Sequence, residues 1–451
     1  MFRIVICIML ALSMGVGKDF SIAQAWEYVL NNNDGIKAEE LGTQRAQKMT
    51  LASKLSFLPN IDFTMAYMHL GDTIALDTTP TKDKILSNAG NNPAVSGILA
   101  QIPNKIDLIK QDIIMGSLNI IYPLYTGGKR YYATKIAALQ EKDAHEMLRL
   151  KKLATFEELV KIYYGVWLQQ EILGTLEEMQ KSAQSHLHNA QKLQKAGQIA
   201  RLEVLAAQVA FDKSKNKTKE ATNTLEISRL ALDTALGTQA TNPTSAPIVP
   251  TSALQENQEF FVQRTLDSYP ALRSLEEKIL IAKQLRKIEI AKFLPEVAVM
   301  GSYFINNNFS PNTTTPSWYG GVMARMPLLS TGGRIPQIQA TKIAQMQLDS
   351  TKSQATKDME LLVKRTYKEV LFAKEEYESL DSSIALAREN LKLQEQAFAQ
   401  GLATSLQVSD ARNMLSSALI EQKGMAYKYV VLLSKLMALS DNIAMFYEIQ
   451  K

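Results

Sequence analysis

The sequence has 451 residues, which is long enough for several domains, and it contains a single cysteine. One cysteine excludes a scaffold held together by internal disulfides. Lys and Arg number 50 against 45 Asp and Glu, and the resulting formal charge of +5 is spread along the chain and gives no indication of nucleic-acid binding.

The first 17 residues have the pattern of a cleavable signal peptide. Arg3 precedes an apolar run, Ile4–Met14, and the small residues Gly15 and Gly17 follow it. The run is shorter than the roughly 20 residues of a spanning helix, and no lipoprotein-type Leu-small-small-Cys sequence surrounds Cys7. We therefore expect export and removal of Cys7. No later stretch is apolar enough for a transmembrane helix, which excludes an inner-membrane transporter and leaves insertion by β-strands open.

Four short segments alternate between apolar and polar residues with the period of two that is typical of β-strands. Two of them flank a long polar loop, residues 71–115, and two flank a short Asn/Thr/Pro-rich loop, residues 306–316. Each half of the chain thus offers one β-hairpin with strands of about ten residues, a length suited to crossing a membrane. A soluble sheet fits the alternation of any single strand equally well. The apolar faces are Ile61, Phe63, Met65 and Tyr67; Leu118, Ile120 and Tyr122; Val297, Val299 and Tyr303; and Trp318, Val322 and Met326.

Two long proline-free blocks indicate very long helices. No proline occurs between Pro123 and Pro243 or after Pro336, and interior proline breaks helices. Apolar residues recur at every third or fourth position within the blocks. The first predicted helix would be on the order of 100 Å long at ~1.5 Å per residue. Periodicity alone fits a soluble antiparallel coiled coil equally well. The predicted helices are 130–195 and 202–236, reversing at Gly197, and about 338–400 and 405–439, reversing at Gly401.

The two halves of the chain share landmarks in the same order, which indicates an internal duplication. Phe57-Leu58-Pro59 recurs 236 residues later as Phe293-Leu294-Pro295, whereas Gly197 recurs 204 residues later as Gly401. The difference indicates about 32 extra residues in the first β-hairpin. Between these landmarks, Pro123-Leu124 recurs as Pro327-Leu328, and Thr126-Gly127-Gly128-Lys129 recurs as Thr331-Gly332-Gly333-Arg334.

These landmarks resemble those of the TolC-like outer membrane factor family over almost the whole mature chain. The turns at 196–205 and 400–408 are similar to the helix-turn-helix tips of that family. The resemblance implies a mainly α fold with a small membrane β part and an internal two-fold repeat. Long antiparallel helical hairpins would form an α-barrel, and four strands per chain would complete a 12-stranded β-barrel in a trimer. Physics favours the trimer independently, because four strands cannot close a barrel and open edges are not tolerated in hydrocarbon.

The resulting segmentation follows the duplication. The predicted segments are 1–17, signal peptide; 18–58, first-half helices; 59–125, first β-hairpin with a long extracellular loop; 126–237, first long helical hairpin; 238–258, linker or equatorial region; 259–294, second-half helices; 295–329, second β-hairpin; 330–440, second long helical hairpin; and 441–451, C-terminal tail.

The resemblance also implies where functional residues lie. At the aperture, Glu203 and Asp410 match positions of acidic rings, and Gln407 stands where the family often has Asp. Phe398 and Ala403 stand at the positions of a tyrosine–arginine gating contact, so closure here would depend more on packing or on other residues. A solvated carboxylate favoured by the helix dipole is an equal alternative for Glu203 and Asp410.

Two further groups of residues are candidates. Exposed turns with small and apolar residues let another helical hairpin approach closely. The candidate adaptor contacts are Gly197, Ile199, Gly401, Leu402 and Thr404, although a simple helix reversal would look similar. Strand alternation predicts that Glu296 and Arg325 face the barrel lumen. The alternative, which we favour, is that they lie at the rim and have no role in selectivity.

The predicted function is a passive exit duct in the outer membrane of a diderm bacterium, with its tunnel in the periplasm. It would serve a tripartite efflux or type I secretion system. The implied partners are two further copies of the chain, a periplasmic adaptor, an inner-membrane pump and outer membrane lipid, without nucleic acid. The alternative is a periplasmic coiled-coil adaptor or structural protein without a pore. Metal handling by the 18 methionines is less favoured than packing.

Neither an enzyme nor a cofactor is expected. His186 and His188 are two apart on a predicted helix and do not share a face as metal ligands would. His145-Glu146 begins a zinc-protease pattern that fails at Arg149. The sequence contains neither a phosphate-binding Gly-rich loop with Lys nor a Gly-x-Ser-x-Gly elbow.

Overall fold

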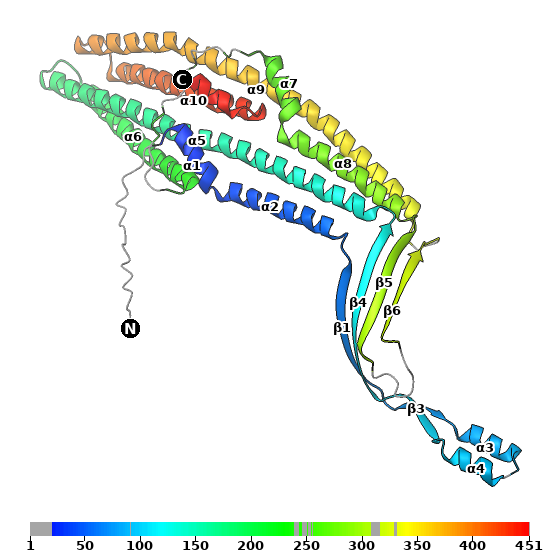
Figure 1. Ribbon diagram of the computed structural model, residues 1–451. Coiled ribbons are helices and arrows are strands. Elements are labelled where there is room, and N and C mark those ends of the chain that lie inside the picture. Colours follow the sequence, from blue (N-terminus) through cyan, green and yellow to red (C-terminus); the bar gives the residue numbers. More distant parts are fainter. Residues whose placement is uncertain are drawn as a thin grey trace, which may run out of the picture. The chain divides into compact units, whose positions relative to one another are not determined.

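The computed structural model describes residues 20–90, 92–238, 243–245, 250, 254, 256–307, 316–328 and 332–450 (Figure 1). The predicted signal peptide, Thr331 and much of the predicted linker lie outside the described residues. The chain divides into two compact units. We call residues 47–140 and 280–346 the sheet unit, and the remainder the helical unit. The helices with residues in both units are α2 (Asp34–Leu55), α5 (Lys129–Lys195), α8 (Pro270–Ala291) and α9 (Arg334–Ala399).

The two long helical hairpins predicted from the sequence are present. The first pairs α5 with α6 (Arg201–Leu236), and the second pairs α9 with α10 (Ser405–Leu439). One boundary differs, because α9 begins at Arg334 and not near Ile338. Pro336 is accommodated in the first turn of α9, where a backbone N–H has no partner within the helix to lose. No helix in the described ranges has an apolar stretch long enough to cross a bilayer.

Shorter helices pack around the hairpins in the helical unit. They are α1 (Ile22–Asn32), α7 (Gln258–Ser268) and α11 (Ile443–Gln450). The core is aromatic: the ring of Phe156 on α5 lies 5.2 Å from Trp26 and 5.4 Å from Phe446, measured between centroids. The predicted C-terminal tail thus contains a helix, α11, in which Phe446 is completely buried.

The described part of the linker packs beside α5. The Tyr163 hydroxyl donates to the carbonyl of Phe20 (2.8 Å) and accepts from the backbone N–H of Ser245 (2.9 Å). The Ser245 hydroxyl in turn accepts from the N–H of Ile22 at 3.1 Å. These contacts tie the segment between the halves to the start of α1 and to the middle of the first long hairpin.

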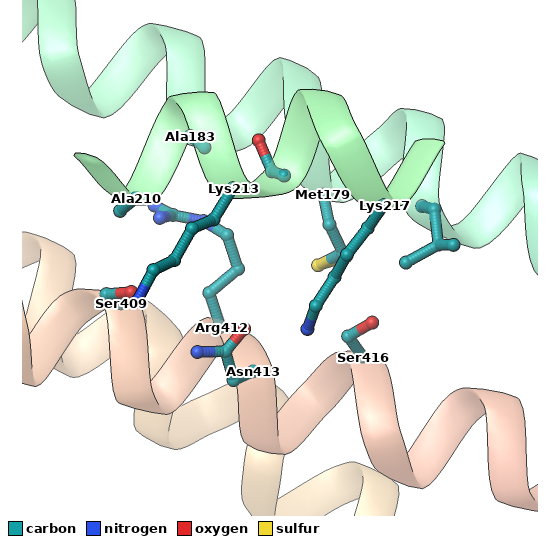
Figure 2. Close-up of a pocket in the computed structure, with 11 residues that line it drawn as sticks. Met179, Ala183, Ala210, Lys213, Lys217, Ser409, Arg412, Asn413 and Ser416 are labelled. Carbon is teal, nitrogen blue, oxygen red and sulfur yellow. The ribbon is translucent and has the colours of Figure 1, made fainter. Parts of the chain in front are cut away.

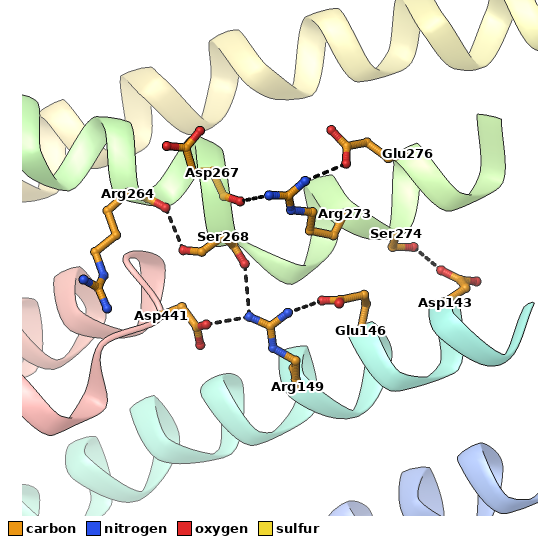
Figure 3. Close-up of polar contacts among 10 residues, drawn as sticks. All are labelled: Asp143, Glu146, Arg149, Arg264, Asp267, Ser268, Arg273, Ser274, Glu276 and Asp441. Atoms are coloured by element: carbon orange, nitrogen blue, oxygen red, sulfur yellow. Dashed lines mark hydrogen bonds and ion pairs between the residues drawn. The ribbon is translucent and has the colours of Figure 1, made fainter. Parts of the chain in front are cut away.

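Arg149 on α5 joins three segments of the helical unit (Figure 3). Its guanidinium donates to Glu146 (2.6 Å), to Asp441 after α10 (2.6 Å) and to the carbonyl of Ser268 at the end of α7 (3.3 Å). Arg264 on α7 donates to the carbonyl of Ser440 at 3.0 Å. The break between α7 and α8 is therefore held to α5 and to the α10–α11 turn by hydrogen bonds from arginines.

The sheet unit contains four antiparallel strands in the order β1-β4-β5-β6 (Figure 1). Each half of the chain supplies one hairpin, as predicted, and β4 pairs with β5 to join the halves. β1 and β6 are the outer strands and have no further partner within the described residues. The strands are β1 (Asn60–His69), β4 (Asp112–Thr126), β5 (Glu296–Asn307) and β6 (Trp318–Arg325).

The alternation of the strands separates a polar face from an apolar face. Asn119 pairs with Asp62 in the register of β1 and β4, and its amide donates to the Asp62 carboxylate at 3.1 Å. The hydroxyl of Ser302 donates to Asn119 at 2.8 Å, so a polar network crosses three strands. On the other face Phe63 and Val322 are 59% and 69% exposed, which leaves a broad apolar surface uncovered in the single chain.

The prediction of a loop at residues 71–115 is wrong, because this segment contains helices and strands. β2 (Ile74–Asp77) pairs with β3 (Lys105–Ile109), and α3 (Thr79–Asn88) and α4 (Pro93–Ala100) lie between them (Figure 1). Both helices begin with proline in their first turn, and Asn92 caps α4 through the N–H of Ala94. Lys82 donates to Asn104 at 2.7 Å and fastens α3 to the second half of the insertion. The extra residues of the first half therefore form a small folded insertion.

The repeated motifs make the same contacts in both halves of the sheet unit. Arg130 donates to the carbonyl of Pro123 at 2.9 Å, and Arg334 donates to the carbonyl of Pro327 at 2.9 Å. Arg130 lies 5.8 Å from the ring of Phe57, and Arg334 lies 5.3 Å from the ring of Phe293. The sequence motifs align Lys129 with Arg334, but the contacts show that Arg130 is the structural equivalent of Arg334.

Candidate functional site at the hairpin tips

Both hairpins reverse through the same backbone geometry. Gly197 and Gly401 each have φ of +74°, a left-handed conformation that side chains with a Cβ rarely adopt. The N–H of Gln198 donates to Leu193 and that of Leu402 donates to Ala397, both at 2.9 Å, which closes the ends of α5 and α9. No atom lies within 4 Å of a Cβ built on either glycine, so conformation and not space requires glycine.

Glu203 lies across the boundary between the hairpins. Its Oε2 accepts a hydrogen bond of 2.6 Å from the backbone N–H of Ser405, the first residue of α10. A carboxylate at a helix N-terminus is favoured by the helix dipole and satisfies an amide that the helix leaves free. Glu203 thus interacts with the dipole of the neighbouring hairpin's helix.

The start of α10 is also capped from within its own hairpin. The hydroxyl of Thr404 accepts from the N–H of Gln407 at 3.3 Å, and the Gln407 side chain accepts from the N–H of Thr404 at 2.8 Å. This reciprocal pair is a capping box. Two of the candidate residues, Thr404 and Gln407, are therefore engaged in defining where α10 begins.

Phe398 and His186 form a buried contact between the hairpins. The ring of Phe398, 2% exposed, lies 4.4 Å from the imidazole of His186 on α5. His186 Nε2 is 3.2 Å from the Ser405 hydroxyl. Burial is the main cause that lowers the pKa of His186 to about 4, the positive charge of Arg412 adds to it, and Glu203 opposes it. The imidazole is therefore neutral at neutral pH.

Arg412 on α10 is the most buried cation near the tips, at 4% exposed. Its Nε donates to the hydroxyl of Ser182 on α5 (2.9 Å), and its Nη2 is 3.4 Å from Glu395 on α9. The Ser182 hydroxyl also donates to Glu395 at 3.2 Å. Burial lowers the pKa of Arg412 from its ordinary value, and Glu395 opposes this shift. The cluster joins three long helices a few turns from the tips.

Of the remaining tip residues, Leu402 and Asp410 face solvent, whereas Ile199 packs inward. Leu402 is 77% exposed, and Asp410 is exposed on α10. Ile199 is half-buried and packs against the core between the hairpins. In this chain Asp410 keeps an accessible carboxylate, whereas Glu203 is bound to a backbone amide.

Glu296 and Arg325 lie opposite one another in the register of β5 and β6. Glu296 nevertheless forms its ion pair with Lys129 at the start of α5. Arg325 is exposed. The pair is at the strand ends next to the helices, and of the two only Glu296 forms an ion pair with a described residue.

Sequence reasoning missed His186, Ser182, Glu395 and Arg412. A signal for Arg412 was available, because it interrupts the apolar stripe of α10 formed by Val408, Ala411 and Leu415, which are all buried. A cation in such a stripe indicates a buried polar contact. His186 was considered only as a metal ligand. Among the described residues no group of three or more His, Cys, Asp or Glu is arranged to hold a metal ion.

Comparison with known proteins identifies the class to which this architecture belongs. The family model of outer membrane efflux proteins matches residues 27–238 and 261–440, one match in each half. The chain belongs to the outer membrane efflux protein family. The family consists of channels and not enzymes, so the protein is an outer membrane efflux channel, and the adaptor without a pore is disfavoured.

Solved channels share the fold at low sequence identity. VceC of Vibrio cholerae has a TM-score of 0.74 and 12% identity, covering 94% of this chain and 96% of that one. CmeC of Campylobacter jejuni has a TM-score of 0.71 and 14% identity, covering 95% and 89%. MtrE of Neisseria gonorrhoeae has a TM-score of 0.72 and 15% identity, covering 94% and 89%. A comparison with curated protein sequences finds no significant match.

Proposed function

We propose that three copies of the chain form one channel. The observation that carries this proposal is the four-stranded sheet, whose outer strands β1 and β6 have no partner in the described chain. Four strands are too few to close a barrel, and open sheet edges are not tolerated in lipid. Twelve strands from three chains would remove every edge and enclose a pore, whereas eight strands from two chains would be filled by side chains. The exposed apolar face of the strands suits contact with lipid.

The trimer would act as the exit duct of a tripartite efflux or type I secretion system. It would receive substrate from an inner-membrane pump through a periplasmic adaptor and release it outside. Membership of the efflux family supports this role. Deletion of the gene should reduce export of toxic compounds or secreted proteins, and expression of the intact chain should restore it. Unchanged export across a panel of drugs, metal ions and proteins would contradict the role.

The hairpin tips are proposed as the adaptor contacts. Leu402 offers a large apolar side chain, Gly197 and Gly401 leave open space beside the backbone, and Ile199 and Thr404 border them. A cysteine at Leu402 should cross-link to a cysteine-bearing adaptor hairpin in cells. The matched control is a cysteine at Glu376, which is on α9 far along the helix from the tip. Absence of any product with all adaptors of the cell, or equal products from both positions, would contradict this assignment.

The aperture is proposed to combine charge with packing. Asp410 would supply an acidic ring, because its carboxylate is exposed. Glu203 and Phe398 would hold the hairpins in the closed arrangement through the contacts described above, and Gln407 would fix the start of α10. D410A should therefore lower cation preference in planar bilayers with little change in conductance, whereas E203A should raise conductance by loosening the tips. Identical effects of the two substitutions would contradict the division of roles.

Glu296 and Arg325 are proposed to lie at the inner rim of the barrel lumen. The ion pair of Glu296 with Lys129 neutralises one charge, which leaves Arg325 as the residue able to influence ions. R325A should change ion preference only slightly, because a hydrated charge in a wide pore is screened. A large change would indicate that Arg325 lines a constriction.

A further inference from the structure

A cavity of about 300 Å³ is lined by residues of α5, α6 and α10, and Arg412 is one of them (Figure 2). Lys213 and Lys217 extend from α6 toward α10. The side chain of Arg412 extends from α10 toward α5, where its Nε donates to the Ser182 hydroxyl at 2.9 Å. Hydroxyl and amide groups of Ser214, Ser409, Asn413 and Ser416 complete the polar lining. No carboxylate is among the residues that line the cavity.

The two lysines form a like-charged pair. They are four residues apart on α6, so their side chains project from the same face, and like charges at this spacing repel. Neither lysine forms an ion pair or a hydrogen bond with another described residue of the chain. Their ammonium groups are therefore available to an external acceptor.

Arg412 adds a buried cation to the two exposed lysines of the cavity. Its guanidinium is nearly inaccessible to solvent, and its contact with Glu395 is long, at 3.4 Å. Its Nη1 has no hydrogen-bond partner in the described part of the chain. A buried guanidinium with unused donors favours a planar or tetrahedral oxyanion, which can accept two hydrogen bonds from it.

We propose that this cleft is a binding site for a phosphate group, either as free phosphate or as a phosphomonoester. Lys213, Lys217 and Arg412 supply the charge, and the serine hydroxyls and the Asn413 amide supply neutral donors at the rim. The cavity is larger than one phosphate ion needs, so an organic remainder can extend over the apolar side chains of Leu176 and Met179.

Occupancy would have a structural consequence. A bound phosphate removes the repulsion between the lysines and links α6 of the first hairpin to α10 of the second. The anion would thereby stabilise the contact between the hairpins near the tips. Every residue of the site belongs to one chain, so the inference does not depend on the trimer or on transport.

The test is binding of inorganic phosphate and of glycerol phosphate, titrated separately against the purified full-length protein in nonionic detergent. Calorimetry at constant ionic strength, with chloride as the replaced anion, separates a specific site from screening. K213Q/K217Q removes two cations of the cleft. K215Q/K219Q is the matched control, because it removes the same charge from exposed positions of the same helix outside the cleft.

We expect saturable binding by the native protein and by the control, and binding weaker by at least about tenfold in K213Q/K217Q. Tighter binding of glycerol phosphate would identify an ester as the ligand, and tighter binding of inorganic phosphate would identify the free ion. Absence of saturable binding for both compounds, or equal weakening in the two double variants, would overturn the proposal. The single variants K213Q and K217Q provide the same test if the double variant fails to fold.

Discussion

Removal of the Glu203 carboxylate should loosen the first turn of α10. In E203A the N–H of Ser405 loses its 2.6 Å acceptor, and no residue of its own helix can replace it. A hydrogen bond to a charged group contributes about 1.5–3 kcal/mol. Because Glu203 is half-buried and water can partly substitute, we expect about 1.5–2 kcal/mol, which corresponds to roughly 10–30-fold faster local opening.

Hydrogen–deuterium exchange with mass spectrometry measures this opening directly. A peptide that covers the start of α10 should exchange faster in E203A, and E203Q should lie between E203A and the native protein because its amide oxygen still accepts. D410A is the control, since Asp410 is exposed on the same helix. Equal exchange in E203A and the native protein would refute the capping role and favour a solvated Glu203.

Three further predictions concern pH, backbone conformation and the repeat. The pKa of His186 is about 4 in the folded protein and about 6.5 in the unfolded chain, so between these pH values the unfolded chain binds more protons. The free energy of unfolding should therefore fall by up to about 3 kcal/mol as the pH decreases from 6.5 to 4. In H186F, thermal unfolding should lack this contribution to the pH dependence. G127A should prevent recovery of folded protein from membranes, since its Cβ would lie 2.5 Å from a carbonyl oxygen, whereas G197A meets no atom and should cost only about 1–2 kcal/mol. R130A and R334A should lower the unfolding temperature by similar amounts, because the two arginines make equivalent contacts; a large difference between them would argue against structural equivalence of the halves.

Patterns that are local in sequence predicted most of the fold. Proline placement and the three-to-four periodicity predicted the long helices, and the period of two predicted the hairpins of the sheet. The repeated motifs predicted the duplication. In both halves an arginine after the Thr-Gly-Gly motif donates a hydrogen bond to the carbonyl of the preceding proline, Pro123 or Pro327. The glycines at both tips adopt the left-handed conformation expected where a helix ends in a tight turn.

Contacts between distant segments could not be predicted in the same way. The bond from Ser405 to Glu203 joins residues about two hundred positions apart, and no local pattern encodes it. The folded insertion was missed because its polar composition resembles a loop, although Asn92-Pro93 is a typical helix start. His186 was judged by metal-ligand spacing, which says nothing about a neutral imidazole packed against Phe398.

The shared channel is tested most directly by the native mass of the mature protein after detergent extraction from isolated outer membranes. Native mass spectrometry should find a complex of three chains, as required if the free edges of β1 and β6 are paired between copies. A monomer or dimer recovered from the soluble periplasmic fraction would contradict the channel, because its strand edges would then remain open.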